Sequence, residues 1–345
     1  MSTAHPPTRR AVLAAALGGA VAVAAPPRPA AARTPVHSPV ITSRAPTLHP
    51  EGVTWDPTRQ AFLVGSVRHG TVSVVRPDGT VRTLVDDRLM VSTLGITVDP
   101  VRRRVLATYQ DPGFGTRTSC RTRGKQSGLG IFDLTTGAPL HRVDLSTVPG
   151  SATGVHGADD VAVDAHGNAY VTDIVTGELY RVDPAGQPSL LLRNPDLLGR
   201  RGVGPNGIVW CPTGHLLVAR YDTGTLLRVP VHAPDRARPV SLRQPLIGAD
   251  GLALRADGSL AVVTNRLASD GPTAVTILRS TDDWTSATAT ARHTPWPDAT
   301  PTTAAATPHG TYVVDGRLPQ LFAGAPTDGF VLRRLPWTED RDVAA

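Results

Sequence analysis

Residues 249–258, ADGLALRADG, decide the fold, because the pattern of this stretch recurs along the chain. A polar residue and a glycine open an apolar, alternating run of strand length, and an Asp-Gly turn signal follows. Five further runs share the pattern in whole or in part, and successive leading residues lie 43 to 65 residues apart. The six leading positions are Glu51, Leu94, Asp159, Asn206, Asp250 and Thr302.

The spacing of these runs predicts a β-propeller, because self-similarity at about 40–50 residues is typical of four-stranded blades. Blade one would use strands over residues 52–56, 61–67, 71–76 and 80–85. Its Asp-Gly turn at residues 78–79 is a hairpin signal, since glycine accepts the positive φ that such turns require. We therefore expect an all-β, six-bladed propeller of four antiparallel strands per blade over residues 45–345, with no long helix.

The ring of a propeller must close, commonly by pairing strands from both ends of the chain. Residues 39–44 could supply an N-terminal strand to the blade that ends near residues 330–335. The extra length between Tyr109 and Gly128 is expected to form a loop over one mouth of the central channel.

Residues 1–32 have the features of an export signal. Arg9 and Arg10 form a twin-arginine pattern, residues 11–25 are apolar and Ala-rich, and residues 30–32 offer a small-residue cleavage site. The apolar segment is too short to remain as a membrane anchor. We expect a secreted bacterial protein in which residues 33–44 form a linker with the possible closing strand. The alternative is an accidental arginine pair in a disordered leader.

The charge of the chain argues against nucleic-acid binding. Residues 1–32 hold three arginines and no acidic residue, so their removal lowers the formal net charge from +6 to +3. Phosphate recognition needs a clustered basic face, and the densest basic run, residues 117–125, is better interpreted as a solvated loop. We expect a monomer with a small-molecule substrate and no membrane partner after signal cleavage.

Cys120 and Cys211 could form a disulfide in an exported protein, although sequence does not determine the pairing. Neither lies in a His or Asn constellation that would indicate a catalytic thiol. The functional hypothesis therefore rests on neither cysteine.

The six leading positions are expected to form one ring, because the first strand of each blade lines the channel. The carboxylates and amide of Glu51, Asp159, Asn206 and Asp250 could not all be buried and charged without compensation. A divalent cation would supply the compensating positive charge. Oxygen ligands favour Ca²⁺ or Mg²⁺, with Mn²⁺ or Zn²⁺ as alternatives, and Ca²⁺ tolerates irregular geometry best. Asp160 could replace Asp159, and the Asp-Gly and Asn-Gly pairs could be ordinary turns.

The motifs at these positions resemble those of the senescence marker protein/gluconolactonase family, which also includes diisopropylfluorophosphatase. The resemblance rests on HPEGVTW at residues 49–55, GPNGIVW at 204–210 and GADGLAL at 248–254. It covers roughly residues 45–335. It implies a six-bladed propeller with one divalent cation, held by Glu51, Asp159, Asn206 and Asp250.

The resemblance also implies a metal-dependent hydrolase of lactones, carboxylic esters or phosphotriesters, with Asp250 as the catalytic base or nucleophile. Two departures weaken the case for gluconolactone itself. Val53 stands where the family usually has proline, and residues 155–156, Val-His, stand where sugar-lactone members carry an arginine. His156 could lie at the mouth of the channel or be structural.

Other classes compete with this hypothesis. No Gly-x-Ser-x-Gly elbow or metalloprotease histidine pair supports a serine or zinc hydrolase. A strictosidine-synthase-like propeller is disfavoured because four oxygen ligands are present. The main alternative is a non-catalytic propeller that binds a small ligand or a protein and uses its cation structurally.

Overall fold

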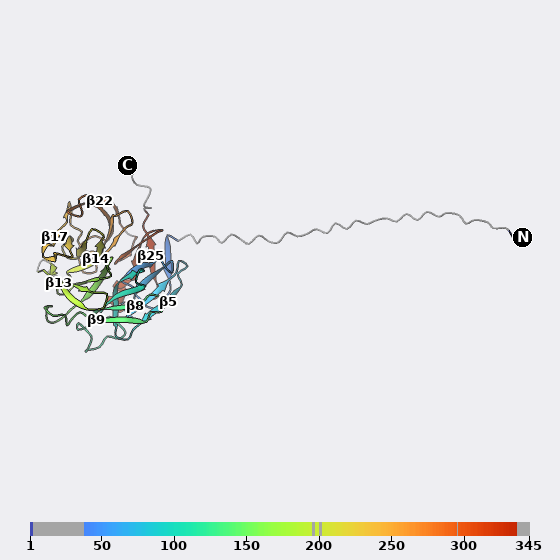
Figure 1. Ribbon diagram of the computed structural model, residues 1–345, viewed down its shortest axis with the longest axis horizontal. Helices are drawn as coiled ribbons and strands as arrows, with labels where there is room; N and C mark the ends of the chain where they lie inside the picture. The colour runs from blue at the N-terminus through green and yellow to red at the C-terminus, as the bar shows by residue number, and fades with distance from the viewer. Residues whose placement is uncertain (3–37, 195–196, 200–201, 295, 337–345) are drawn as a thin grey trace. The chain divides into compact units, whose positions relative to one another are not determined.

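The alternating apolar runs fold into six sheets. The computed structural model describes residues 1–2 and 38–336, apart from residues 195–196, 200–201 and 295. The predicted export signal lies outside the described residues except for its first two. Figure 1 shows the sheets following one another around a ring, from β5 through β9, β13 and β17 to β22 and β25. The predicted all-β, six-bladed propeller is therefore confirmed.

The first three blades each contain four antiparallel strands in sequence order, with the first strand innermost. Blade one has the predicted strands, each within a few residues of its expected bounds. The strands of these blades are β2 Val53–Asp56, β3 Ala61–Gly65, β4 Thr71–Val75 and β5 Val81–Asp86; β6 Ser92–Asp99, β7 Arg104–Gln110, β8 Ser127–Asp133 and β9 Pro139–Asp144; and β10 Ala158–Val163, β11 Ala169–Asp173, β12 Glu178–Val182 and β13 Pro188–Arg193.

The last three blades repeat this order with two variations: blade five has an additional strand, and blade six takes its outer strand from the N-terminus. Blade five has a fifth strand, β18 Ser241–Leu242, which runs parallel to β22 and covers its outer edge. The other strands are β14 Pro205–Cys211, β15 His215–Arg220, β16 Thr225–Pro230 and β17 Arg238–Pro239; β19 Ala249–Leu254, β20 Leu260–Thr264, β21 Ala274–Arg279 and β22 Ser286–His293; and β23 Ala304–Thr307, β24 Gly310–Asp315, β25 Phe330–Arg334 and β1 Val40–Ser43.

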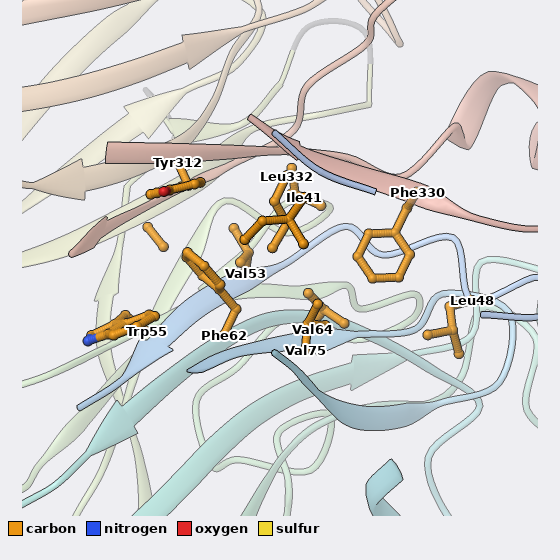
Figure 2. Close-up of a cluster of buried hydrophobic side chains, with 12 residues drawn as sticks. Ile41, Leu48, Val53, Trp55, Phe62, Val64, Val75, Tyr312, Phe330 and Leu332 are labelled. Atoms are coloured by element: carbon orange, nitrogen blue, oxygen red, sulfur yellow. The ribbon is translucent and has the colours of Figure 1, made fainter. Parts of the chain in front are cut away.

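Blade six closes the ring as expected. The N-terminal strand β1 pairs antiparallel with β25, with Val40 opposite Arg333 and Ser43 opposite Phe330. Figure 2 shows the core that this closure creates, where Ile41 and Tyr312 of blade six meet Phe62 of blade one. The rings of Phe62 and Tyr312 lie 4.9 Å apart between centroids. Both ends of the propeller are thus bound into one hydrophobic interface.

The helical segments whose bounds the structure gives are short: the α-helix α1 Leu318–Phe322 and the 3₁₀ turn η2 Pro234–Arg236. Neither is long or apolar enough to cross a membrane. The connection between β7 and β8 is a loop, as predicted, and its Phe114 ring lies 4.5 Å from that of Phe322 in α1. Cys120 is exposed and Cys211 is buried, and both are free thiols, so the possible disulfide does not form.

His215 is a buried titratable group outside the predicted site. Its Nδ1 lies 3.0 Å from the Thr213 hydroxyl, and burial lowers its pKa to about 4, helped by the charge of Arg228. Between pH 4 and 6.5 the unfolded chain therefore binds the proton more tightly, so stability should fall as pH falls through this window. We expect a loss of at most about 3 kcal/mol in the free energy of unfolding.

Chemical denaturation at pH 4.5 and pH 7 measures this effect. The variant His215→Asn, which has no imidazole to protonate, should lack this part of the pH dependence. An equal dependence in the variant would show that other groups cause it.

Candidate functional site

Glycines bring the inner strands of neighbouring blades into backbone contact. A methyl group on Gly207 would overlap the backbone oxygen of Asp250 and lie 2.9 Å from the amide nitrogen of Leu252. A methyl group on Gly95 would lie 2.5 Å from the Cα atom of Asp160. Gly207 and Gly251 lie inside β14 and β19, and neither has a positive φ. The Asn-Gly pair at residues 206–207 and the Asp-Gly pair at 250–251 are therefore parts of strands, and their alternative interpretation as turns is wrong.

A β-bulge occurs at the leading position of four blades. The register shifts between Thr93 and Ile96, Ala158 and Val161, Pro205 and Ile208, and Ala249 and Leu252. Each bulge contains a leading residue and the residue after it. A bulge changes the direction of the side chains at its position. It therefore affects the side chains of Leu94, Asp159, Asn206 and Asp250 in the same way.

Hydroxyl groups hold the backbone of the leading residues. The Thr108 hydroxyl of β7 donates to the Asp159 carbonyl oxygen at 2.5 Å, and that of Thr172 in β11 donates to the Asn206 carbonyl oxygen at 2.7 Å. Thr302, the sixth leading residue, donates to the carbonyl oxygen of Glu51 at 2.6 Å. These bonds join neighbouring blades at the level of the predicted ring, which fixes the relative heights of the inner strands.

Electrostatic coupling shows that the predicted carboxylates lie near one another. Burial raises the pKa of Glu51 well above its ordinary value, and the charges of Asp159, Asp250 and Asp160 raise it further. The pKa of Asp159 is raised in the same way, by burial and then by Asp250, Asp160 and Asp173. Carboxyls from blades one, three and five thus interact across the channel. Leu94 and Thr302 complete the ring without charge.

The structure distinguishes Asp159 from Asp160. The two oxygens of Asp160 accept the backbone N–H groups of Val161 at 2.8 Å and Ile208 at 3.1 Å. Burial nevertheless raises its pKa to about 7. Asp159 is 4% exposed, and its Oδ2 is a buried atom with no hydrogen-bond partner among the described residues. Asp159 is therefore the better candidate for a ligand, and Asp160 ties blade three to blade four.

Asn265 is a site residue that sequence reasoning missed. It is fully buried at the end of the second strand of blade five. Its Nδ2 donates to Asp250 Oδ2 and, at 3.0 Å, to the carbonyl oxygen of Pro301. Its Oδ1 accepts the Tyr221 hydroxyl at 2.7 Å. Asp111 follows the second strand of blade two, whereas Asp173 ends that of blade three and is equivalent to Thr264, so the repeat held no consistent signal for Asn265.

Asp250 has the electrostatics of a group that can exchange a proton near neutral pH. Burial raises its pKa to about 7, hydrogen bonding from Asn265 lowers it, the charge of Asp160 raises it, and hydrogen bonding from Asn206 lowers it. A carboxyl with a pKa near the working pH suits a general base. Asn206 is 7% exposed and lies beside Asp250, as the ring predicts.

The donor chemistry fits a hard divalent cation, because desolvated, mutually repelling carboxyls and an unpartnered Asp159 oxygen would all be relieved by a positive charge. The site is not a preformed cage, however. Within the described ranges no group of three or more His, Cys, Asp or Glu side chains could hold a metal ion. A cation would have to draw Glu51, Asp159 and Asp250 closer together, with the amide of Asn206 as an additional ligand.

His156 belongs to a different network. It is buried, its Nε2 donates to the Ala152 carbonyl oxygen at 2.9 Å, and its Nδ1 lies 3.1 Å from an Asp173 oxygen. The hydrogen bond with Asp173 raises the pKa of His156. Of the two interpretations of His156, the structural one is correct.

A channel of about 410 Å³ runs along the inner strands from Glu51 to their other end, and Asp159 and Asp250 are not among its lining residues. Glu51, Asp160 and Asn206 line it where the inner strands begin, and Trp55 and Trp210 line it where they end. We call these two ends the N-end mouth and the C-end mouth. Glu51 and Asn206 are therefore reachable by water and by a slender ligand, and the buried Asp250 lies beside Asn206.

Comparison with known proteins adds information on the fold. No protein-family profile matches the sequence, and no curated protein is detectably similar. Among solved structures, the major Malassezia sympodialis allergen Mala s 1 has a TM-score of 0.67 at 18% identity, over 86% of this chain and 96% of that chain. A gluconolactonase from Xanthomonas campestris has 0.58 at 16%, over 86% and 89%. Virginiamycin B lyase from Staphylococcus aureus has 0.54 at 10%, over 86% and 98%.

These similarities confirm the predicted likeness to gluconolactonase-type propellers at the level of the fold. The three proteins are an allergen, a gluconolactonase and a lyase. Because one propeller fold carries such different activities, the reaction has to be argued from the site.

Proposed function

We propose that this propeller is a divalent-metal-dependent hydrolase of lactones or related esters. The observation that supports the proposal most directly is the approach of Glu51, Asp159 and Asp250, three desolvated carboxyls from three blades, beside Asn206 at one end of a channel. Coupled carboxyls with raised pKa values in a cavity are typical of catalytic and metal sites. The likeness to a gluconolactonase fold agrees with this class.

The residues divide into two roles in this proposal. Glu51, Asp159 and Asn206 would mainly hold the cation, to which Asp250 would also be a ligand. Ca²⁺ fits the oxygen donors best, with Mg²⁺, Mn²⁺ or Zn²⁺ as alternatives. When bound, the cation would polarise the substrate carbonyl and lower the pKa of a water molecule.

Asp250 would act as the base, with Asn265 fixing the orientation of its carboxyl. Asp250 takes a proton from the attacking water, the water oxygen bonds to the carbonyl carbon, and the ring C–O bond breaks. The proton then returns to the leaving oxygen, so that a hydroxy acid forms. Asp250 could alternatively attack the carbonyl itself, because both roles need the same ionised carboxylate.

A non-catalytic propeller with a structural cation is the second candidate. Glu51, Asp159 and Asp250 come from three blades, so a cation held among them would tie the blades together without any reaction. Secretion after removal of residues 1–32, a monomeric state and a small-molecule substrate remain predictions from the sequence.

Metal dependence provides the test. Thermal unfolding and hydrolysis of a panel of lactones and aryl esters are measured in EDTA and after addition of Ca²⁺. At about a hundred times the dissociation constant, Ca²⁺ should stabilise the protein by about 3 kcal/mol and raise its melting temperature by roughly 5 °C. EDTA should abolish hydrolysis, and Ca²⁺ should restore it.

Two other results have clear meanings. Stabilisation by Ca²⁺ without turnover of any substrate would favour the non-catalytic candidate. If neither stability nor activity responds to Ca²⁺, Mg²⁺, Mn²⁺ or Zn²⁺, the proposed metal site is wrong.

A further inference from the structure

The two mouths of the channel differ in their surroundings. At the N-end mouth, the buried side chains Val67, Leu318 and Leu321 form an apolar cluster, against which Phe114 and Leu267 pack. These residues come from the connections between second and third strands in blades one, two, five and six. Apolar loops from four blades therefore meet on the side where the inner strands begin.

At the C-end mouth, small side chains leave the channel open. Blades five and six present Ala253, Ala304, Ala305 and Ala306 to a cavity that also contains Trp55 and Trp210. The channel runs along about four residues of each inner strand, or about 13 Å at strand geometry. A volume of about 410 Å³ then corresponds to a mean cross-section of about 30 Å², which is wide enough for an extended hydrocarbon chain or a small ring end-on.

A second, larger cavity continues from the C-end mouth. It is a groove of about 1180 Å³ over blades two, three and four, and it shares Val98, Pro100, Val163 and Trp210 with the wall of the channel. The Trp210 ring stacks on that of Tyr170, with centroids 6.1 Å apart and planes 8° apart. The indole of Trp210 is thus held in a defined orientation where channel and groove meet.

Three polar side chains of the groove, Arg102, Asn168 and Arg181, are bonded to protein groups. Arg102 Nη2 donates to the Ala165 carbonyl oxygen at 3.0 Å. Arg181 donates to the Asn168 side-chain oxygen at 2.8 Å, and Asn168 donates to Asp164 at 2.7 Å. The apolar surface of the groove includes Leu190, Leu191, Pro212, Trp210 and Val101, which is 83% exposed, and His166 and His232 also line the groove.

We infer that the channel and groove bind a ligand with a small ester or lactone head and an apolar tail, which reaches the carboxyls through the C-end mouth. The head lies near Glu51 and Asn206, and the tail passes Ala306 and Trp210 into the groove. The substrate class that we infer, apolar-tailed lactones rather than sugar lactones, rests on the proposed function. The inferred binding of such ligands does not require that the protein hydrolyse them.

Binding of γ-butyrolactone, γ-octalactone and γ-dodecalactone tests the inference by isothermal titration calorimetry, with the Asp250→Asn protein in Ca²⁺ to limit hydrolysis. Affinity should rise with the tail by up to about fourfold for each methylene that is buried. Ala306→Phe, at a half-buried position of the channel wall, should weaken γ-dodecalactone by at least about tenfold and leave γ-butyrolactone unchanged. Ala323→Phe, an exposed position beside α1, is the matched control and should change neither.

A second variant guards against misfolding of Ala306→Phe. Trp210→Ala should weaken γ-dodecalactone by about tenfold or more without narrowing the channel. Equal affinity for the three lactones, or equal effects of Ala306→Phe and Ala323→Phe, would overturn the inference. Tail-dependent binding with no hydrolysis by the parent protein would support the inferred ligand class and overturn the proposed function. Hydrolysis with the same kcat/KM for all three lactones would support the proposed function and overturn the inferred preference for an apolar tail.

Discussion

The Asp250→Asn variant should hydrolyse lactones at least about a hundredfold more slowly than the parent protein, yet its metal-free form should be more stable. Loss of activity follows because an amide cannot accept the proton of the attacking water. The gain in stability follows from burial, which raises the pKa of Asp250 from 3.8 to about 7. At pH 8 the folded protein therefore holds an ionised carboxylate where its charge is disfavoured.

The sign of the pH dependence follows from the same shift. Between about pH 4 and 7 the folded state binds the Asp250 proton more tightly than the unfolded chain, so the stability of the metal-free protein falls as pH rises. Asparagine removes this contribution, and the variant should be more stable at pH 8 by about 1–3 kcal/mol. Denaturant unfolding in EDTA at pH 5 and pH 8 measures the difference, which should shrink at the lower pH.

Asp78→Asn is the matched control, because Asp78 also precedes a glycine but lies in an exposed turn, where it accepts the Thr80 N–H at 2.9 Å. It should leave both activity and the metal-free stability near those of the parent. An Asp250→Asn protein that is less stable than the parent and fully active would contradict both the proposed role of Asp250 and its electrostatic surroundings.

Replacement of Gly207 by alanine should destabilise the protein by more than about 3 kcal/mol and could prevent folding. The added methyl group would overlap the backbone oxygen of Asp250 in the next blade. Backbone atoms of two packed inner strands cannot yield as the tip of a side chain can. The clash would push β14 from β19, which also separates Asn206 from Asp250. Far-UV circular dichroism and denaturant unfolding measure the outcome.

Gly258→Ala separates this packing effect from ordinary glycine geometry. Gly258 has a φ of +78° in a turn, and nothing lies within 4 Å of a methyl group placed on it. Alanine there should cost only about 1 kcal/mol, from the strained backbone alone. If the two variants are equally destabilised, close contact between inner strands is not the reason for glycine at the leading positions.

Both predictions concern one feature, the point where inner strands of adjacent blades meet. The bulges at Asp159, Asn206 and Asp250 turn these side chains, and the following Gly207 and Gly251 let the strands approach. Stability and function therefore oppose each other at this ring, because the carboxyls that would bind a cation destabilise the metal-free fold.

The number of blades, the strand pattern and the leading positions were predictable from the sequence, since these depend on local periodicity and on turn residues that repeat. The closing strand β1 was also predictable, because a propeller without it would leave an open edge. The export signal and the identity of the cation stay predictions. Burial of Asp159 and Asp250 could be expected once the ring was assumed.

Details that depend on neighbours in other blades were not predictable and became visible in the folded ring. Asp159 and Asp160 are adjacent and chemically identical, and they differ because Ile208 of blade four donates to Asp160 alone. Asn265 contacts Asp250 through strand pairing and packing that no local pattern encodes. His156 has a structural role because its imidazole contacts the carboxylate of Asp173. Such contacts join residues far apart in the chain, so their geometry arises only when the ring closes.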